Sequence, residues 1–420
     1  MRNSILISLL IYAGLASSHS AVYNCDTKNI FETVSTIKDI APIIRIDSWV
    51  DLGNKTLTLP PNSTVEITHG GLDNGCIVGT NTTLTTGIYN IFGERLVIRG
   101  KWCVDHAYAE WFGSCGTSDD TQYIQKCLDT FFQCRLLNRT YQANTIKLPD
   151  NSLLEGSGQG RYQCSTLKQI DTYKGDFITT GDDAFSGVIV SGIRFCGGRS
   201  QNTAIRITVP CSKIRNVICD QYQGNGINLK DRAWGTTLSH CNIYGNMVTA
   251  KNRQSLTGIL VDTKGGLISI EHSNINYYET GIHIKKGAQI SINNCNISDC
   301  SQNEMKRPNA CIKISDGYGI DIYDNYIENF STGIQLLSGK LVNIHDNYIN
   351  GLSVASFGVD IKGAVENLCI TNNFIYMGYK KAWAISLRTP KCDKCQIHIY
   401  QNELDNNKLY ELEEKNIAPK

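Results

Sequence analysis

The chain has 420 residues, 41% of them hydrophobic, and a formal net charge of +1. Its length allows one large domain or two ordinary ones, and its bulk charge alone gives no reason to expect a nucleic acid or other polyanion as partner. The 17 cysteines suit an exported protein with some disulfides, and their odd number leaves at least one thiol unpaired or intermolecular.

The N-terminus has the order of features found in a secretory signal peptide. Arg2 precedes an apolar run over residues 5–15, and small residues follow it. We expect residues 1–20 to be a signal peptide cleaved near Ser18 to Ser20, and the mature protein to be secreted, either extracellular or periplasmic. No later run has the length of a membrane span, so we expect none.

Residues 21–105 are expected to form a β-rich lead-in and early coils. From Val50 onward, apolar residues alternate with polar ones, and a Pro-Pro-Asn turn separates two strands. One clear helix follows near residues 119–131, where the apolar residues fall at i, i+3, i+4 and i+7. They are Ile124, Cys127, Leu128 and Phe131. We predict that this short helix caps the open end of a β core, because such an end exposes strand edges.

An eight-residue phrase recurs from Ile268 to Leu404. The first copy is Ile268-Ser-Ile-Glu-His-Ser-Asn-Ile275, and six copies end at intervals of 22, 30, 22, 26 and 29 residues, as in a solenoid. The residues expected to face inward are at odd positions up to the third and at even positions from the sixth. Side chains of a continuous strand alternate strictly, so a corner must lie between the third and sixth positions. Stacked coils would place the sixth positions in one internal ladder. These are Cys241, Ser273, Cys295, Asn325, Asn347, Asn373 and Asn402.

A second strand signal, usually opened by Gly-Ile, precedes most copies of the phrase. Each coil therefore has three short strands: the Gly-Ile strand, the Ile-x-Ile strand after a brief turn, and the Asn-x-Ile strand after the ladder corner. This pattern predicts an all-β fold, a parallel β-helix (solenoid) over residues 106–404, and the crossover rule makes it right-handed. Residues 405–420 lack the repeat and are expected to form a C-terminal tail.

The segment before the repeats carries a family resemblance. Ala109-Glu-Trp-Phe-Gly followed by Asp119-Asp-Thr resembles the opening of pectate-lyase-superfamily proteins and phage tailspikes, and Ile146-Lys-Leu-Pro-Asp-Asn-Ser-Leu-Leu-Glu-Gly is similar to their next segment. The resemblance covers roughly residues 50 to 404 and implies a single-stranded right-handed β-helix. Members of the family include lyases, hydrolases, epimerases and proteins that only bind, so the resemblance does not choose an activity.

In β-helix enzymes of this resemblance the cleft runs along the Gly-Ile strands. Alternation identifies the outward residues there, and coils stack about 4.8 Å apart. We expect Lys230, Asp262 and Lys285 to form one row, with two further residues beside it and two at strand ends. The candidate catalytic set is Lys230, Asp231, Asp262, Glu279, His283, Lys285 and Lys313.

Two chemistries fit these residues. In β-elimination on a uronate, Lys285 or Lys313 would neutralise the carboxylate while His283 or Lys230 removed the neighbouring proton. In glycoside hydrolysis, two carboxylates must face one bond, and Asp262 with Asp231 or Glu279 would supply them. The aromatic residues expected to stack on sugar rings are Trp234, Tyr277, Tyr278 and Tyr318.

Other readings of the same residues stay open. Alternating Lys and Asp on neighbouring strands also stabilise a sheet as cross-strand pairs, which would fit a non-catalytic glycan-binding or adhesion module. The Asp pair and His of polygalacturonases are absent from the equivalent positions, and no Asp cluster suits calcium, so we expect no metal or cofactor. The expected partner is a polysaccharide or cell-surface glycan, not a nucleic acid, bound by a monomer or homotrimer.

Three cysteine pairs are close enough in sequence to form disulfides. They are Cys127/Cys134, Cys300/Cys311 and Cys392/Cys395.

Overall fold

A computed structural model describes most of the chain after residue 19. The described residues are 20–113, 115–116, 118–158, 163–171, 175–181, 184–197, 202–245, 257–300, 310–351, 357–378, 382–388 and 396–405. The chain divides into two compact units, Met1–Asp105 and His106–Lys420. Residues 1–19 of the expected signal peptide, the Cys392/Cys395 pair and residues 406–420 of the expected tail lie outside the described residues.

The first unit is built from short parallel strands. A main sheet has the order β1-β2-β5-β7-β4 with β8 paired to β7, and β3 pairs with β6. The buried residues alternate along these strands, as in β4 and β5, so the alternation predicted after Val50 forms a half-buried sheet. The elements are β1 (Val22–Cys25), α1 (Ile30–Thr36), β2 (Ile43–Ile46), β3 (Trp49–Asp51), β4 (Thr56–Thr58), β5 (Thr64–Ile67), β6 (Gly71–Asp73), β7 (Gly75–Thr86) and β8 (Leu96–Cys103).

The second unit begins with η1 (Ala109–Trp111), a 3-10 helix, and α2 (Thr121–Phe131). The buried residues of α2 are the four predicted from its apolar spacing, and the helix contacts η1 and the strands β9 (Gln133–Arg135) and β11 (Ile146–Leu148). Neither α-helix of the described chain has the length and apolar character that crossing a bilayer requires.

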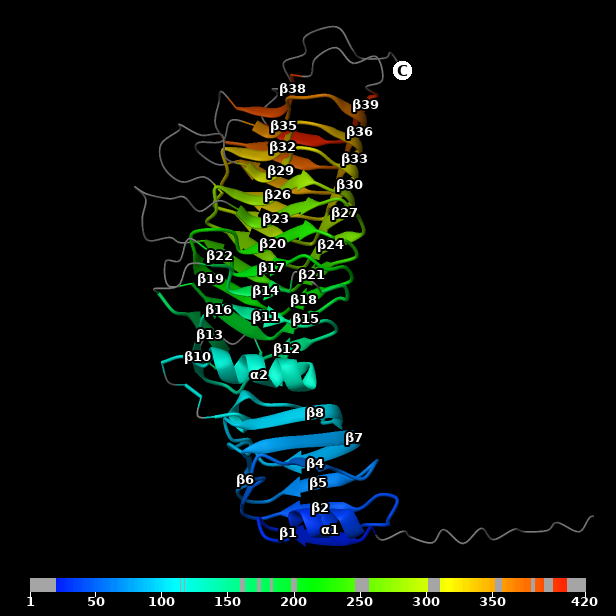
Figure 1. Cartoon of the computed structure of the whole chain (residues 1–420). Helices are drawn as coiled ribbons and strands as arrows, with labels where there is room; N and C mark the ends of the chain where they lie inside the picture. The colour runs from blue at the N-terminus through cyan, green and yellow to red at the C-terminus, as the bar shows by residue number, and fades with distance from the viewer. Residues whose placement is uncertain are drawn as a thin grey trace, which may run out of the picture. The chain divides into compact units, whose positions relative to one another are not determined.

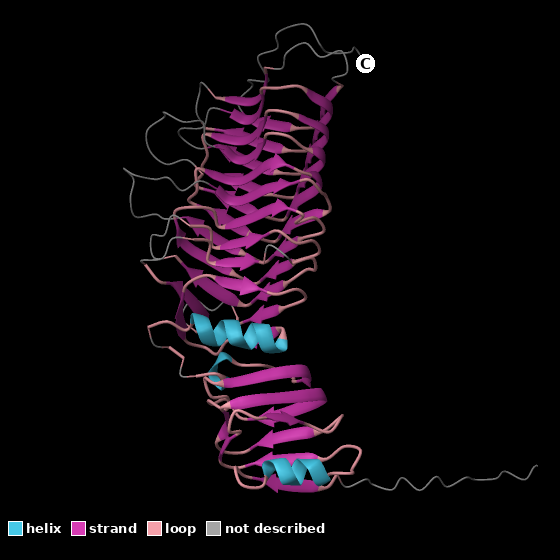
Figure 2. Ribbon diagram, in the orientation of Figure 1, coloured by secondary structure: helices cyan, strands magenta, loops and turns pink. Residues whose placement is uncertain are grey.

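Three parallel sheets follow, which wind around one core (Figures 1 and 2). The Gly-Ile sheet has ten strands: β11, β14 (Ile178–Thr180), β17 (Ile205–Ile207), β20 (Ile227–Asp231), β23 (Thr257–Thr263), β26 (Thr280–Lys286), β29 (Ala310–Ile314), β32 (Thr332–Leu336), β35 (Phe357–Ile361) and β38 (Trp383–Leu387). The Ile-x-Ile sheet has eleven: β9, β12 (Leu153–Glu155), β15 (Ile189–Ser191), β18 (Lys213–Arg215), β21 (Thr237–Ser239), β24 (Ile268–Glu271), β27 (Ala288–Asn293), β30 (Tyr318–Tyr323), β33 (Gly339–His345), β36 (Val365–Thr371) and β39 (Ile397–Tyr400).

The Asn-x-Ile sheet also has eleven strands, and each coil passes through the three sheets in turn. They are β10 (Thr140–Ala143), β13 (Ser165–Gln169), β16 (Ile193–Cys196), β19 (Ile218–Tyr222), β22 (Asn242–Gly245), β25 (Asn274–Asn276), β28 (Asn296–Ser298), β31 (Tyr326–Glu328), β34 (Tyr348–Gly351), β37 (Phe374–Met377) and β40 (Glu403–Asp405). Every pairing between neighbouring coils is parallel, as the repeat predicts, because each strand lies directly above its counterpart.

The internal ladder predicted at the corner between the Ile-x-Ile and Asn-x-Ile sheets is confirmed. The side chain of Asn347 donates to the carbonyl oxygen of Ile322 (2.8 Å) and to Oδ1 of Asn373 (2.9 Å). Asn373 repeats the pattern toward Asn402, at 2.9 Å. Each amide thus satisfies the corner backbone of the coils beside it, where polar groups are shut off from water.

The predicted disulfides are not formed in the described structure. All fifteen described cysteines are free, including the buried pairs Cys127/Cys134 and Cys300/Cys311. Cys241 and Cys295 occupy ladder positions, where burial raises the pKa of each thiol to about 12. These thiols therefore stay neutral and act as small apolar groups with a weak donor.

Candidate functional site

The outer face of the Gly-Ile sheet brings most of the predicted charged residues together. Lys230 of β20 lies opposite Asp262 of β23, and His283 of β26 lies opposite Lys313 of β29. The leucine, valine and isoleucine residues that alternate with them along the strands point inward and are fully buried, so the polar side chains between them point outward. Lys230, Asp262, His283 and Lys313 therefore lie on the outer face of four successive coils, as alternation predicts.

A β-bulge changes the register of this row between β23 and β26. The register shifts between Val261 and Asp262, so that the Asp262 backbone pairs with Lys286 instead of Lys285. The Lys285 ammonium nevertheless reaches Oδ2 of Asp262 at 2.7 Å, with side-chain exposures of 59% and 27%. This ion pair is partly solvated and contributes about 1 kcal/mol or less to stability.

His283 is the most perturbed group on this face. Its Nε2 lies 2.8 Å from Oγ of Ser315, and the ring is half-buried. The pKa of His283 is lowered to about 4, chiefly because burial disfavours the charged ring and also because of the positive charges of Lys313 and Lys285; the charge of Asp262 acts in the opposite direction. The imidazole is consequently neutral at pH 7, and one of its two ring nitrogens carries a lone pair beside two cations.

The two other predicted carboxylates lie at opposite ends of the strands. Glu279 precedes β26, seven residues before Lys286, the residue that pairs with Asp262. Seven extended residues span about 23 Å, beyond the separation that two catalytic carboxylates need. The predicted pairing of Asp262 with Glu279 is therefore wrong. Asp231 lies one residue beyond Lys230 and pairs with Thr263, so it is the one predicted carboxylate that remains beside Asp262.

The predicted aromatic residues separate into two corners. Trp234 and Tyr318 lie where the chain leaves the Gly-Ile sheet and are exposed (43% and 48%). Tyr277 and Tyr278 lie at the other corner, before β26, and Tyr278 is only 2% exposed. Its ring fits inside the core because Gly226 and Gly258 lack the Cβ atoms that would lie 3.1 and 3.3 Å from it. Tyr278 is consequently a core residue and not part of the candidate surface.

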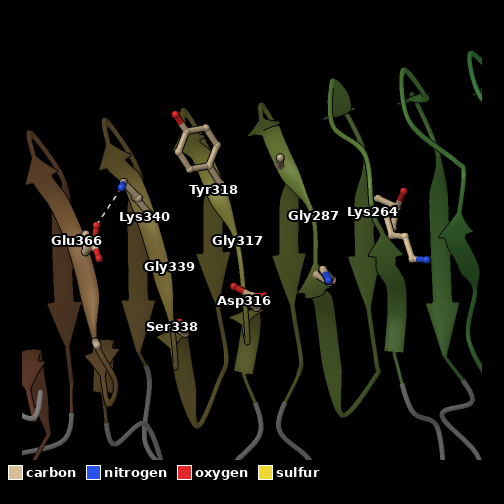
Figure 3. Close-up of a pocket in the computed structure, with 13 residues that line it drawn as sticks. Lys264, Gly287, Asp316, Gly317, Tyr318, Ser338, Gly339, Lys340 and Glu366 are labelled. Atoms are coloured by element: carbon tan, nitrogen blue, oxygen red, sulfur yellow. Dashed lines mark ion pairs between the residues drawn. The ribbon is translucent and has the colours of Figure 1, made fainter.

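A pocket of about 420 Å³ lies at the corner between the Gly-Ile and Ile-x-Ile sheets, beside the charged row (Figure 3). Its lining comes from five successive coils and includes Tyr318. We name it the corner groove. Its polar lining residues are Thr263, Lys264, Lys286, Asp316, Tyr318, Ser338, Lys340 and Glu366, and its small ones are Gly287, Ala288, Gly317, Gly339 and Ala364.

Strand alternation missed most of the corner groove, because these residues follow the strand ends. A signal does exist in the sequence: a polar residue followed by glycine closes successive Gly-Ile strands. The copies are Lys264-Gly, Lys286-Gly, Asp316-Gly, Ser338-Gly and Lys362-Gly. The glycines are needed for packing, since a Cβ on Gly287 or Gly317 would lie 2.7 or 2.9 Å from a core isoleucine.

Comparison with known proteins agrees with this architecture. The family model of the right-handed β-helix region matches residues 225–411. This match covers the coils from β20 to β40, where the three sheets of the solenoid are continuous. The predicted handedness is thereby confirmed, and no curated protein matches the chain.

Solved structures of other β-helix proteins resemble this one. The A-module of mannuronan C-5 epimerase AlgE4 from Azotobacter vinelandii has a TM-score of 0.56 at 14% identity, over 73% of this chain and 97% of that one. The enzymatically active domain of tailspike protein 2 from bacteriophage CBA120 has a TM-score of 0.51 at 17% identity, over 64% and 42%. The tailspike protein of Acinetobacter baumannii phage AM24 gives 0.52 at 14%, over 73% and 56%. At these identities the likeness shows the fold alone.

Proposed function

We propose that this β-helix protein acts on a uronate-containing polysaccharide at the outer face of the Gly-Ile sheet, as a lyase. The observation that carries the proposal is the neutral, half-buried imidazole of His283 beside Lys313 and Lys285. A base held neutral next to cations suits removal of the proton beside a sugar carboxylate, because the cations stabilise the negative charge that develops on that carboxylate.

The elimination would proceed as follows. The uronate carboxylate binds the ammonium groups, and His283 takes the proton from the adjacent ring carbon, C5. The C5–H electron pair forms the double bond between C5 and C4, the C4–O bond breaks, and the glycosidic oxygen leaves with the C4–O electron pair and takes a proton from water. A bound carboxylate beside His283 would also raise the imidazole pKa from about 4 toward neutrality, making it a stronger base when substrate is present.

Hydrolysis is less well supported by this geometry. Of the predicted carboxylates, Asp262 is engaged by Lys285 and Glu279 lies at the far end of the strand, which leaves Asp231 alone as a partner. The named activity of the epimerase module, C-5 epimerisation of mannuronan, begins with removal of the same C5 proton, so the shared fold supports a uronate polymer for this chain too.

The second candidate function is a non-catalytic glycan-binding module. The observation that favours it is the Lys285–Asp262 ion pair, which is the kind of cross-strand contact that supports a sheet without any chemistry. In that case the exposed rings of Trp234 and Tyr318 would hold sugar by stacking.

Two parts of the chain outside the site complete the proposal. Helix α2, with its apolar stripe against β9 and β11, would cap the first coil and exclude edge pairing. Residues 1–20 would direct export, which places the protein where extracellular polysaccharides are found.

The test is an activity panel with polygalacturonate, mannuronan, guluronan and a neutral glucan. Elimination produces an unsaturated uronate that absorbs near about 235 nm, and it creates reducing ends at the same time. We expect the absorbance to rise with time on a uronate polymer, and the rate of this rise to be about 10² to 10⁴-fold lower in His283→Ala. Lys213→Ala, an exposed lysine of β18 on another sheet, is the matched control and should behave as wild type.

Each alternative gives a distinct result. Reducing ends without absorbance would indicate hydrolysis, and a wild-type rate in His283→Ala would refute His283 as the base. Proton exchange at C5 in deuterated water, without either product, would indicate epimerisation. Glycan binding with no product on any polymer would favour the binding module.

A further inference from the structure

We infer that the corner groove is a second glycan-binding site, distinct from the face that carries His283, and that it holds an acidic oligosaccharide in extended form. The groove is lined by five successive coils, from Lys264 to Glu366. Four coil spacings correspond to about 19 Å. Its length along the helix axis and its floor of glycine and alanine fit an extended chain better than a compact ligand.

The charges of the groove are unequal along its length. Figure 3 places Lys340 and Glu366 on neighbouring coils at one end and Lys264 toward the other. Lys340 is paired with Glu366 at 3.1 Å, so these two charges offset each other. Among the described residues, no ion pair joins Lys264 or Lys286 to a carboxylate. Two unpaired ammonium groups on consecutive coils therefore offer a site for a ligand carboxylate.

The middle of the groove has the two groups that sugar rings contact in proteins. Tyr318 presents a ring that is 48% exposed, and the aliphatic face of a sugar packs on such a ring. Asp316, two residues earlier and exposed, is an acceptor for neighbouring ring hydroxyls. The Asp316 charge also disfavours a dense polyanion, which points to a polymer with one carboxylate per sugar and free hydroxyl groups.

Residues of the groove directly follow residues of the proposed catalytic face in the sequence. Lys286 follows Lys285 directly, and Asp316 follows Ser315, the hydrogen-bond partner of His283. The polymer class named here rests on the proposed function, but the location of the binding site does not. A chain held in the groove would remain next to the catalytic face between turnovers.

The test is calorimetric titration of the full-length mature protein with tetramers of galacturonate, mannuronate and guluronate, and with cellotetraose as the neutral probe. We expect one uronate tetramer to bind. Lys264→Ala/Lys286→Ala should weaken it about tenfold at low salt, since each exposed charge contact contributes modestly. Tyr318→Ala should weaken binding by a similar factor and Tyr318→Phe should not, because the ring and not the hydroxyl carries the contact.

Two controls separate this inference from the proposed function. Lys213→Ala should bind as wild type, and His283→Ala should bind normally while losing turnover. Circular dichroism checks that the variants fold, as expected for exposed side chains. The inference is overturned if the double variant binds as tightly as wild type, if no uronate tetramer binds, or if cellotetraose binds equally well. In the wild type, groove binding without turnover of any uronate polymer would contradict the proposed function alone, and turnover without groove binding would contradict this inference alone.

Discussion

The Asn347→Ala substitution tests the ladder that holds the coils in register. Asn347 is 2% exposed, and its amide makes five hydrogen bonds. Nδ2 donates to the carbonyls of Ile322 (2.8 Å) and His345 (2.9 Å) and to Oδ1 of Asn373 (2.9 Å). Oδ1 accepts from the backbone N–H of Asn325 (3.1 Å) and from its Nδ2 (3.0 Å).

Alanine removes all five bonds and leaves their partners buried. The backbone N–H of residue 347 keeps its bond to Asn373, since that contact does not use the side chain. Because the two hydrogens of Nδ2 serve three acceptors, the five contacts correspond to about four full bonds. At about 1 kcal/mol per bond the loss is about 4 kcal/mol, and entry of water into the space lowers it to roughly 3 kcal/mol. We expect the free energy of unfolding to fall by that amount.

Urea unfolding followed by circular dichroism measures the effect as a lower midpoint. Asn343→Ala is the matched control, because Asn343 is exposed on the adjoining strand β33, and its free energy of unfolding should change by less than about 0.5 kcal/mol. Hydrogen exchange at the Asn325 amide should accelerate in Asn347→Ala alone. Equal midpoints for the two variants would refute the argument that the ladder stabilises the corner.

Three further predictions follow from single contacts. The pKa of His283 in the folded state (about 4) lies below its value in the unfolded chain, so protonation favours unfolding. As the pH falls from 6.5 to 4, the free energy of unfolding of the wild type should decrease by about 1 kcal/mol relative to His283→Gln, measured by urea titration. This figure is reduced to allow for the partial exposure of the ring. Arg388→Ala should cost about 2 kcal/mol by calorimetry, since it leaves the fully buried Asp360 with Lys362 (3.3 Å) as its remaining ion-pair partner, whereas Arg388→Lys should cost less. Leu128→Ala in α2 should cost about 2–4 kcal/mol and speed exchange in β9.

The ladder and the charged row could be predicted from the sequence because both depend on local parity. The flip between the third and sixth positions of the phrase requires a corner wherever the chain goes next, and Asn347 follows from it. Likewise, the outward position of Lys230 and Asp262 follows from alternation within each strand, and the stacking of coils then makes them neighbours.

Alternation along a strand does not predict contacts between different coils, and such contacts determine the positions of Tyr278, Glu279 and the corner groove. Tyr278 is buried because glycines of two other coils leave room for its ring, which no local pattern reveals. Glu279 is at a strand end, as expected, but at the end away from Asp262, and the extended strand β26 separates the two carboxylates. The groove residues lie after the strand ends, where alternation stops and backbone turns set the side-chain directions.

The bulge at Val261 and Asp262 links the two proposed surfaces. Consecutive residues at a strand end point in different directions, so Lys285 reaches Asp262 while Lys286 lines the corner groove. The bulge places the backbone of Asp262 opposite Lys286, so the Lys285 side chain contacts the Asp262 carboxylate along the diagonal. A regular register would place Asp262 opposite Lys285 and alter the side-chain directions that free Lys286 for the groove. A one-residue irregularity thus separates two adjacent lysines between the two surfaces: Lys285 lies on the proposed catalytic face and Lys286 lines the corner groove.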